Sequence, residues 1–135
     1  MTEPAKRTGE VIISAAFPQL FVADISRACA WFAATLGFET VFTYGEPPFY
    51  GQVKRDGARL NLRSIDRPVF DGDLREREQL LSAYLPVEHV EQLFVEFERQ
   101  GAGFHSTLKQ QPWGTRDFVV RDPDGNLLCF ASDGA

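Results

Sequence analysis

The sequence is poor in the residues that build disulfide frameworks, metal centres and nucleic-acid interfaces. Its 135 residues include 2 cysteines, too few for a disulfide scaffold, and 2 histidines, and neither pair has the spacing of a zinc module. Basic residues number 14 against 19 acidic ones, giving a formal net charge of −5, and the basic residues form no stripe along the chain. Because nucleic-acid binding depends on such a stripe, we expect no nucleic-acid partner.

The sequence also lacks a secretory leader and long apolar runs. The N-terminal segment MTEPAKRTGE is too polar for a signal peptide, and no apolar run approaches the length of a membrane span. Cys29 and Cys129 fall in a helical and a strand pattern, where free thiols act as small hydrophobic residues. We therefore expect a soluble, cytoplasmic protein with no membrane partner, and a flexible N-terminus over residues 1–10.

Hydrophobic periodicity is plentiful, and it predicts the first half of a fold. An apolar run from Val11 to Val22 predicts a buried strand that bends at Pro18, since proline cannot donate to a strand ladder. Asp24 then offers an N-cap for a helix that ends before Gly37, a favourable residue for a left-handed cap. Three strands follow, over residues 38–44, 49–55 and 58–64.

The same order of elements recurs after a charged connection at residues 65–79. A strand over residues 80–87 precedes a helix that begins at Glu88 and ends before Gly101. The last strands are expected over residues 104–108, 116–121 and 126–132.

This repetition predicts an α+β fold made of two βαβββ modules. The modules cover residues 11–64 and 80–132 of a single domain that spans residues 11–135. One helix cannot cover the inner face of its sheet, so we expect the two sheets to form a half-open, barrel-like cleft. Such a cleft is the default binding site.

The final hairpin is the clearest local signal. The turn Asp122-Pro123-Asp124-Gly125 combines a fixed φ at proline with a glycine that accepts positive φ, so two adjacent strands must flank it. Just upstream, Trp113 is the first residue that we would test for ligand contact.

Few residues with catalytic chemistry occur at strand positions that face the predicted cleft. Asn61 and Cys129 occupy matching central positions, and we interpret Cys129 as a buried, inert thiol because no base or cation accompanies it. His89 falls in the first turn of the second helix and His105 in a strand. Neither has a carboxylate at ligand-like spacing, so we interpret both as structural or surface residues. The charged run at residues 66–78 predicts a solvated loop or a short helix.

Aromatic side chains are the remaining candidates for a binding site. Several occur at strand ends and turns, where a residue can face a cleft. A cleft walled by aromatic residues and rimmed by acidic ones would bind a flat or cationic organic molecule by stacking and cation–π contacts. The candidate ligand-binding residues are Phe42, Phe49, Tyr50, Arg63, Tyr84 and Trp113.

The sequence resembles the vicinal oxygen chelate superfamily of glyoxalase I, bleomycin resistance proteins and extradiol dioxygenases. The matching motifs are LFVAD at residues 20–24, WF at 31–32, LGF at 36–38 and RDPDGN at 121–126. QPWG at residues 111–114, followed by Arg116 and Phe118, is similar to the bleomycin-binding resistance proteins. This resemblance implies the paired βαβββ fold, contact of Trp113 with a drug, and a homodimer in which the N-terminal strand crosses at Pro18.

The resemblance also implies a departure from the metal-dependent members, in which one residue on each of four strands binds the ion. The matching positions here are Phe17, Asn61, Ser82 and Cys129, and none is histidine, aspartate or glutamate. We therefore expect no metal, no cofactor and no catalytic residue, but a protein that sequesters a glycopeptide or another cationic or aromatic ligand. Two alternatives stay open: a lyase or dioxygenase with an atypical metal site, and a binding protein for some other hydrophobic metabolite.

Overall fold

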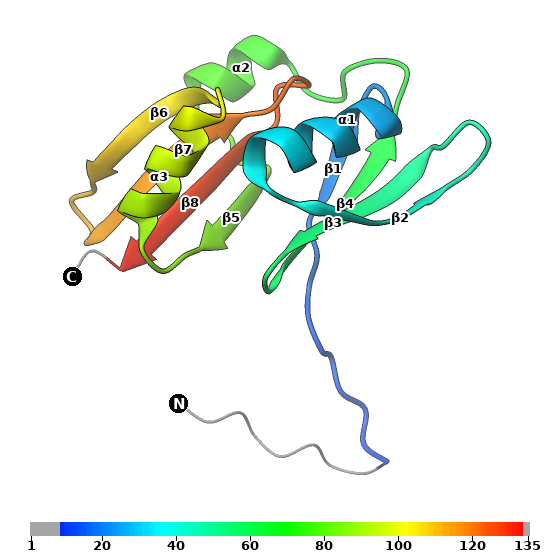
Figure 1. Ribbon diagram of the computed structural model, residues 1–135, viewed down its shortest axis with the longest axis horizontal. Helices are drawn as coiled ribbons and strands as arrows, with labels where there is room; N and C mark the ends of the chain where they lie inside the picture. Colours follow the sequence, from blue (N-terminus) through cyan, green and yellow to red (C-terminus); the bar gives the residue numbers. More distant parts are fainter. Residues whose placement is uncertain (1–8, 134–135) are drawn as a thin grey trace.

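The computed structural model describes residues 9–133, which form two four-stranded sheets (Figure 1). Sheet A has the strand order β1-β4-β3-β2, with β1 parallel to β4 and the other neighbours antiparallel. Its elements are β1 (Gln19–Val22), α1 (Ile25–Trp31), the π-helical turn η1 (Phe32–Leu36), β2 (Glu39–Tyr44), β3 (Tyr50–Arg55) and β4 (Ala58–Ser64).

Sheet B repeats this topology in the order β5-β8-β7-β6, with β5 parallel to β8. The predicted α+β fold of two βαβββ units is therefore confirmed, with two separate sheets that are not closed into a barrel. The elements of the second half are β5 (Ala83–Pro86), α3 (Val90–Arg99), β6 (Gly103–Gln110), β7 (Thr115–Arg121) and β8 (Leu127–Asp133).

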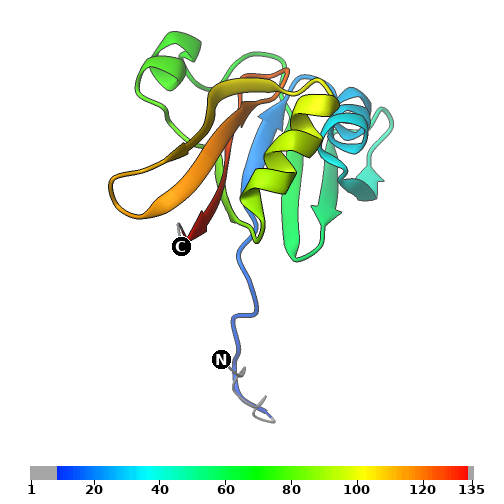
Figure 2. The ribbon, with the colours of Figure 1, turned by 60° about the vertical axis from the view of Figure 1, so that its left-hand side comes forward.

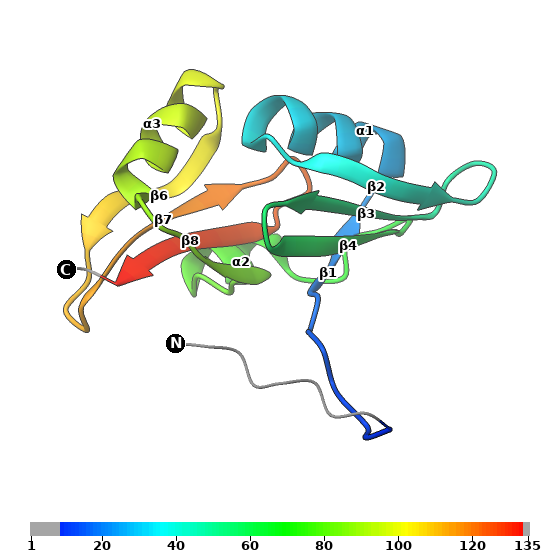
Figure 3. The ribbon, with the colours of Figure 1, turned by 60° about the horizontal axis from the view of Figure 1, so that its bottom comes forward.

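The helices cover the two sheets unequally. α1 and α3 lie on the same side of the pair of sheets, whereas α2 (Gly72–Arg77), in the connection between the halves, lies against the other side of sheet B (Figures 2 and 3). Within residues 9–133, no helix covers the face of sheet A opposite α1. None of these helices is long and apolar enough to cross a membrane.

Leucine and phenylalanine supply much of the core, which is continuous between the two halves. Phe97 of α3 is fully buried, and its ring centroid lies 5.1 Å from that of Phe130 and 5.9 Å from that of Phe118. Strand alternation turns Leu60 and Leu62 into this core. Five of the 12 phenylalanines of the sequence are buried in this core.

The two main helices begin differently, although their endings match. The Asp24 carboxylate accepts a hydrogen bond of 2.8 Å from the Arg27 amide, and Gly37 ends η1 with φ 72°, so both predicted boundaries are confirmed. The predicted start of the second helix at Glu88 is wrong. His89, with φ 59°, is the N-cap, and the fully buried Val90 fixes the first turn there.

The predicted strand from Val11 is also wrong over residues 11–18, because β1 begins at Gln19. The chain before β1 extends away from the sheets (Figure 1), and Val11 and Ile13 are 96% and 92% exposed. β1 runs parallel to β4, with Gln19 opposite Asn61. Residues 11–15 would therefore lie opposite residues that precede the start of β4 at Ala58, and they have no strand to pair with there. Likewise β5 begins at Ala83 and not at residue 80.

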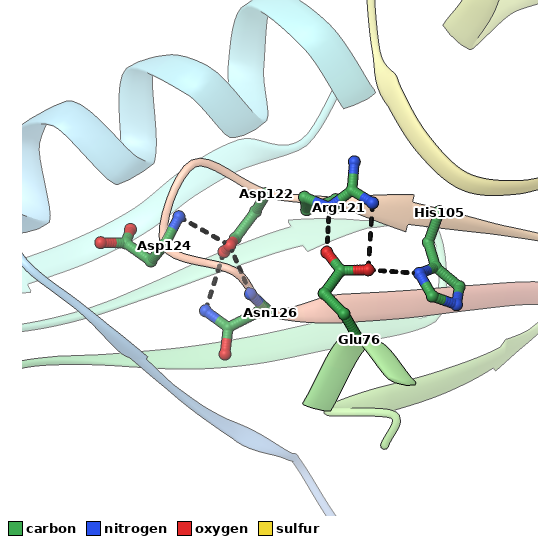
Figure 4. Close-up of polar contacts among 6 residues, drawn as sticks. All are labelled: Glu76, His105, Arg121, Asp122, Asp124 and Asn126. Carbon is green, nitrogen blue, oxygen red and sulfur yellow. Dashed lines mark hydrogen bonds and ion pairs between the residues drawn. The ribbon is translucent and has the colours of Figure 1, made fainter. Parts of the chain in front are cut away.

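The β7–β8 turn, whose internal hydrogen bonds are drawn in Figure 4, connects the two halves. The buried Asp122 carboxylate accepts hydrogen bonds from the backbone amides of Asp124 and Asn126 at 2.9 and 2.7 Å, and from the Asn126 side chain at 2.8 Å. Asn126 Nδ2 also donates to the Phe21 carbonyl at 3.0 Å, and the Ala23 amide donates to Asp124 at 2.9 Å. Burial raises the pKa of Asp122 to about 6, against the effect of these donors.

An ion pair makes a second connection between the halves. Arg55 of β3 donates to both carboxylate oxygens of Glu96 in α3, at 2.6 and 3.0 Å, and to the Leu36 carbonyl at 2.8 Å. The hydrogen bonds between the two side chains raise the pKa of Arg55 and lower that of Glu96. This bidentate geometry fixes α3 against the first half.

Replacing Asn126 by alanine is expected to destabilise the fold by about 2 kcal/mol, because a buried carboxylate and a backbone carbonyl both lose a donor. Urea unfolding measures the loss. Asn61→Ala is the matched control, since that side chain makes one hydrogen bond on the open face of sheet A. Equal losses in the two variants would contradict the role given to the turn.

Candidate functional site

Four of the six predicted ligand-binding residues lie together on the helix-free face of sheet A. Tyr50 is directly opposite Arg63 in the β3–β4 register, and the rings of Phe42 and Tyr50 are 5.9 Å apart. The Arg63 guanidinium lies 5.9 Å from the centre of the Phe49 ring. Phe42 and Phe49 are 41% and 45% exposed, so this aromatic surface is open to a ligand.

The other two predicted residues belong to sheet B. Tyr84 on β5 is opposite Cys129 on β8, and Trp113 sits at the β6–β7 turn with 73% of its surface exposed. A hydrogen bond from the Gly114 amide to the Gln111 carbonyl closes that turn. The β6–β7 turn and the β2–β3 loop lie at opposite ends of the molecule (Figure 1). One chain thus presents the predicted site as two separate groups.

A cavity of about 680 Å³ does lie between the two halves. It is lined by the β3–β4 turn, β5, the start of α3 and residues 15–18. Tyr84 is the one predicted ligand-binding residue among its lining residues. The cavity is therefore not the aromatic site that the sequence predicts.

The structure places the four positions matched to metal ligands at or just before four strands. Asn61 lies on β4 and Cys129 on β8. Phe17 precedes β1, and Ser82 precedes β5, where its hydroxyl donates to Asn126 at 3.2 Å. The strand residues that pair with Asn61 and Cys129 are Gln19 and Tyr84.

The side chains at these central positions do not suit a divalent ion. Phe17, Asn61, Ser82 and Cys129 supply a phenyl ring, an amide, a hydroxyl and a single thiol in place of the imidazoles and carboxylates that such an ion prefers. Across residues 9–133, no group of three or more His, Cys, Asp or Glu side chains could hold a metal.

His105 has a carboxylate partner that the sequence analysis missed. Its Nδ1 atom lies 2.5 Å from Glu76 of α2, and Arg121 of β7 donates to both oxygens of the same carboxylate (Figure 4). The hydrogen bond from Arg121 is the main reason that the pKa of Glu76 falls to about 2. Glu76 therefore anchors α2 to sheet B, and its charge is already matched by Arg121.

The charged run at residues 66–78 contains the predicted short helix and is exposed apart from Arg75 and Glu76. It contains α2, and Arg75 is buried there, with its guanidinium 4.7 Å from the centre of the Phe70 ring. Arg75 and Glu76 reach partners far along the chain, so no local pattern could have identified them.

The comparisons with known proteins agree with this fold. Residues 13–130 match the family described as the Glyoxalase/Bleomycin resistance protein/Dioxygenase superfamily. The chain belongs to this superfamily. A bleomycin resistance protein from Geobacillus stearothermophilus is 32% identical over 124 residues, which cover 84% of this chain and 92% of that protein.

Solved structures of the superfamily include binding proteins and enzyme-related proteins. The bleomycin-binding protein of Streptomyces verticillus, in complex with copper(II)-bleomycin, is 26% identical and superposes with a TM-score of 0.68 over 90% of this chain and 97% of that one. A glyoxalase-related enzyme from Clostridium phytofermentans is 21% identical, with a TM-score of 0.72 over 94% and 99% of the two chains. Superfamily membership therefore establishes the fold and leaves the chemistry to the site residues.

Cys129 occupies a central position of this superfamily fold, and its surroundings suppress its reactivity. The side chain is buried in a small cluster with Val119, Leu127 and Ala131. Burial, with a smaller contribution from the Asp117 carboxylate, raises the pKa of the thiol to about 11. The thiol is therefore protonated at neutral pH and is a poor nucleophile.

We expect neither cysteine of the folded protein to react with Ellman's reagent at pH 8, because both thiols are buried. Both should react after unfolding in guanidinium chloride, which serves as the internal control. Rapid modification of Cys129 in the folded protein, identified by mass spectrometry, would contradict the interpretation of Cys129 as an inert thiol and would favour a nucleophilic role.

Proposed function

We propose that this protein binds an aromatic small molecule of the bleomycin type and sequesters it without chemical change. The observation that carries the proposal is the set of exposed aromatic side chains at Phe42 and Phe49 on the side of sheet A opposite α1, at Tyr84 on β5 and at Trp113 in the β6–β7 turn. Flat ligands stack on such rings. The similarity to bleomycin resistance proteins supports bleomycin as the first ligand to test.

The absence of turnover in this proposal follows from the chemistry of the central residues. Phe17 and Asn61 offer neither a nucleophile nor a general base, the Ser82 hydroxyl donates a hydrogen bond to Asn126, and burial keeps the Cys129 thiol protonated. Burial of the two free thiols also suits a reducing compartment, so we propose a cytoplasmic location.

A cationic group of the ligand would fit best against sheet B. Asp117 lies on the face of that sheet opposite α3, where its carboxylate accepts hydrogen bonds from Gln111 at 2.8 Å and Thr115 at 3.3 Å. Its charge contributes to the raised pKa values of Tyr84 and Cys129, so its field reaches the middle of this face. The same two hydrogen bonds hold both ends of the turn that carries Trp113.

We further propose a homodimer in which sheet A of one copy faces sheet B of the other. This arrangement would bring together the two groups of ligand-binding residues that one chain keeps apart. The extended residues 9–18 support it, because Val11 and Ile13 expose apolar surface that a second copy could bury. Pro18 lies directly before β1, where such an arm would cross to the partner.

Bleomycin should quench the fluorescence of Trp113 in a saturable manner. The Trp31→Phe variant isolates this signal, since the chain has 2 tryptophans and Trp31 packs against Phe32 in the first half. In the same background, Trp113→Ala should weaken binding about tenfold in calorimetry through loss of stacking. Trp31→Phe alone should leave the affinity unchanged. Absence of quenching at millimolar bleomycin would contradict the bleomycin proposal.

A further inference from the structure

The helix-free face of sheet A is basic, although the protein as a whole is acidic. The two central strands, β3 and β4, carry three basic residues on this face. Lys54 is opposite Arg59, and Tyr50 is opposite Arg63. Lys54 lies 3.5 Å from Glu39. Within residues 9–133 neither Arg59 nor Arg63 forms an ion pair, although the chain has 19 acidic residues.

A chain of hydrogen bonds fixes the direction of the polar groups between these two arginines. Arg59 donates to Gln52 Oε1 at 2.9 Å, and Gln52 Nε2 donates to Asn61 Oδ1 at 2.8 Å. A guanidinium cannot accept a hydrogen bond, so the Gln52 oxygen must face Arg59 and its amide nitrogen must face Asn61. Asn61 then uses its oxygen within the chain, and its Nδ2 group remains as a donor.

The consequence is that Asn61, Arg59 and Arg63 all present donors on this face. Asn61 Nδ2 makes no hydrogen bond to another residue between 9 and 133, and Arg63 contacts the face of the Phe49 ring without a hydrogen bond to the described part of the chain. Gln52 is buried beneath them at 8% exposure, so its orientation is fixed. A ligand that brings another donor or a cation here would leave these groups unmatched.

We propose that this face binds the acidic group of an aromatic ligand, a carboxylate, sulfonate or phosphate held by Asn61, Arg59 and Arg63. The ligand's ring would lie against Phe42 and Tyr50, whose centroids are 5.9 Å apart on the same face. The inference deepens the proposed function, on which it rests, because it names the chemical group that the sheet A wall recognises. Together with Asp117 on sheet B, it describes a cleft whose two walls differ in charge.

Two dyes with one ring system test this inference. Sheet A should favour 1-anilinonaphthalene-8-sulfonate over the uncharged N-phenyl-1-naphthylamine by about tenfold, because charge-assisted hydrogen bonds form with the sulfonate alone. Arg59→Gln and Arg63→Gln should each weaken binding of the sulfonate dye about fivefold to tenfold, with little effect on the uncharged dye. Added salt should weaken the sulfonate dye selectively.

The control variant is Arg67→Gln, which removes an arginine whose side chain is 79% exposed and lies outside sheet A. Circular dichroism confirms that each variant is folded. Equal affinity of the wild type for the two dyes would overturn the inference, as would equal losses in Arg67→Gln and Arg59→Gln.

Bleomycin binding, measured on the same preparations, separates this inference from the proposed function. A preference for the sulfonate dye without bleomycin binding would overturn bleomycin as the ligand and retain the acidic-group site. Bleomycin binding without any preference between the dyes would retain the proposed function and overturn the acidic-group site.

Discussion

The buried carboxylate of Asp122 lies where the two halves of the protein meet, and the placement of both sheets depends on how it is stabilised. Its oxygens accept donors from the turn and from Asn126, and Asn126 in turn reaches the backbone of β1. A buried charge without these partners would cost several kcal/mol. The turn sequence DPDGN is therefore a connection between modules as well as a hairpin turn.

This connection sets the geometry of the candidate site. With α1 and α3 on one side, the opposite faces of the sheets carry the residues available to a ligand, and α2 covers part of sheet B through Glu76, His105 and Arg121. In the proposed function, the open aromatic residues of the two sheets form one binding surface in two pieces. A second copy of the chain is the simplest partner that can join the pieces, since closed symmetry supplies both combinations at once.

Local chemistry explains which features the sequence could predict. The Asp24 cap, the left-handed Gly37 and the DPDGN turn each depend on a few neighbouring residues, and alternation along β4 correctly separated Leu60 and Leu62 from Asn61 and Arg63. The two βαβββ units followed from the repetition of such local signals.

Features that depend on distant residues were not predictable in the same way. The start of β1 is set by the length of β4, and the contact between His105 and Glu76 joins segments from different parts of the chain. The grouping of the six candidate residues into two sets depends on how the sheets are placed, which no short motif encodes. The donor chain from Arg59 to Asn61 likewise needs the β3–β4 register.

The most direct test of the account is a mixing experiment with two variants whose binding of bleomycin is weakened. Tyr50→Ala removes a sheet A ring and Trp113→Ala a sheet B ring; each protein alone should bind bleomycin weakly. If each cleft combines sheet A of one copy with sheet B of the other, a mixed dimer has one cleft with both substitutions and one with neither. Refolding the variants together should therefore restore wild-type affinity in about a quarter of the clefts, by random pairing of copies. A mixture that binds no better than either variant alone would contradict the shared site.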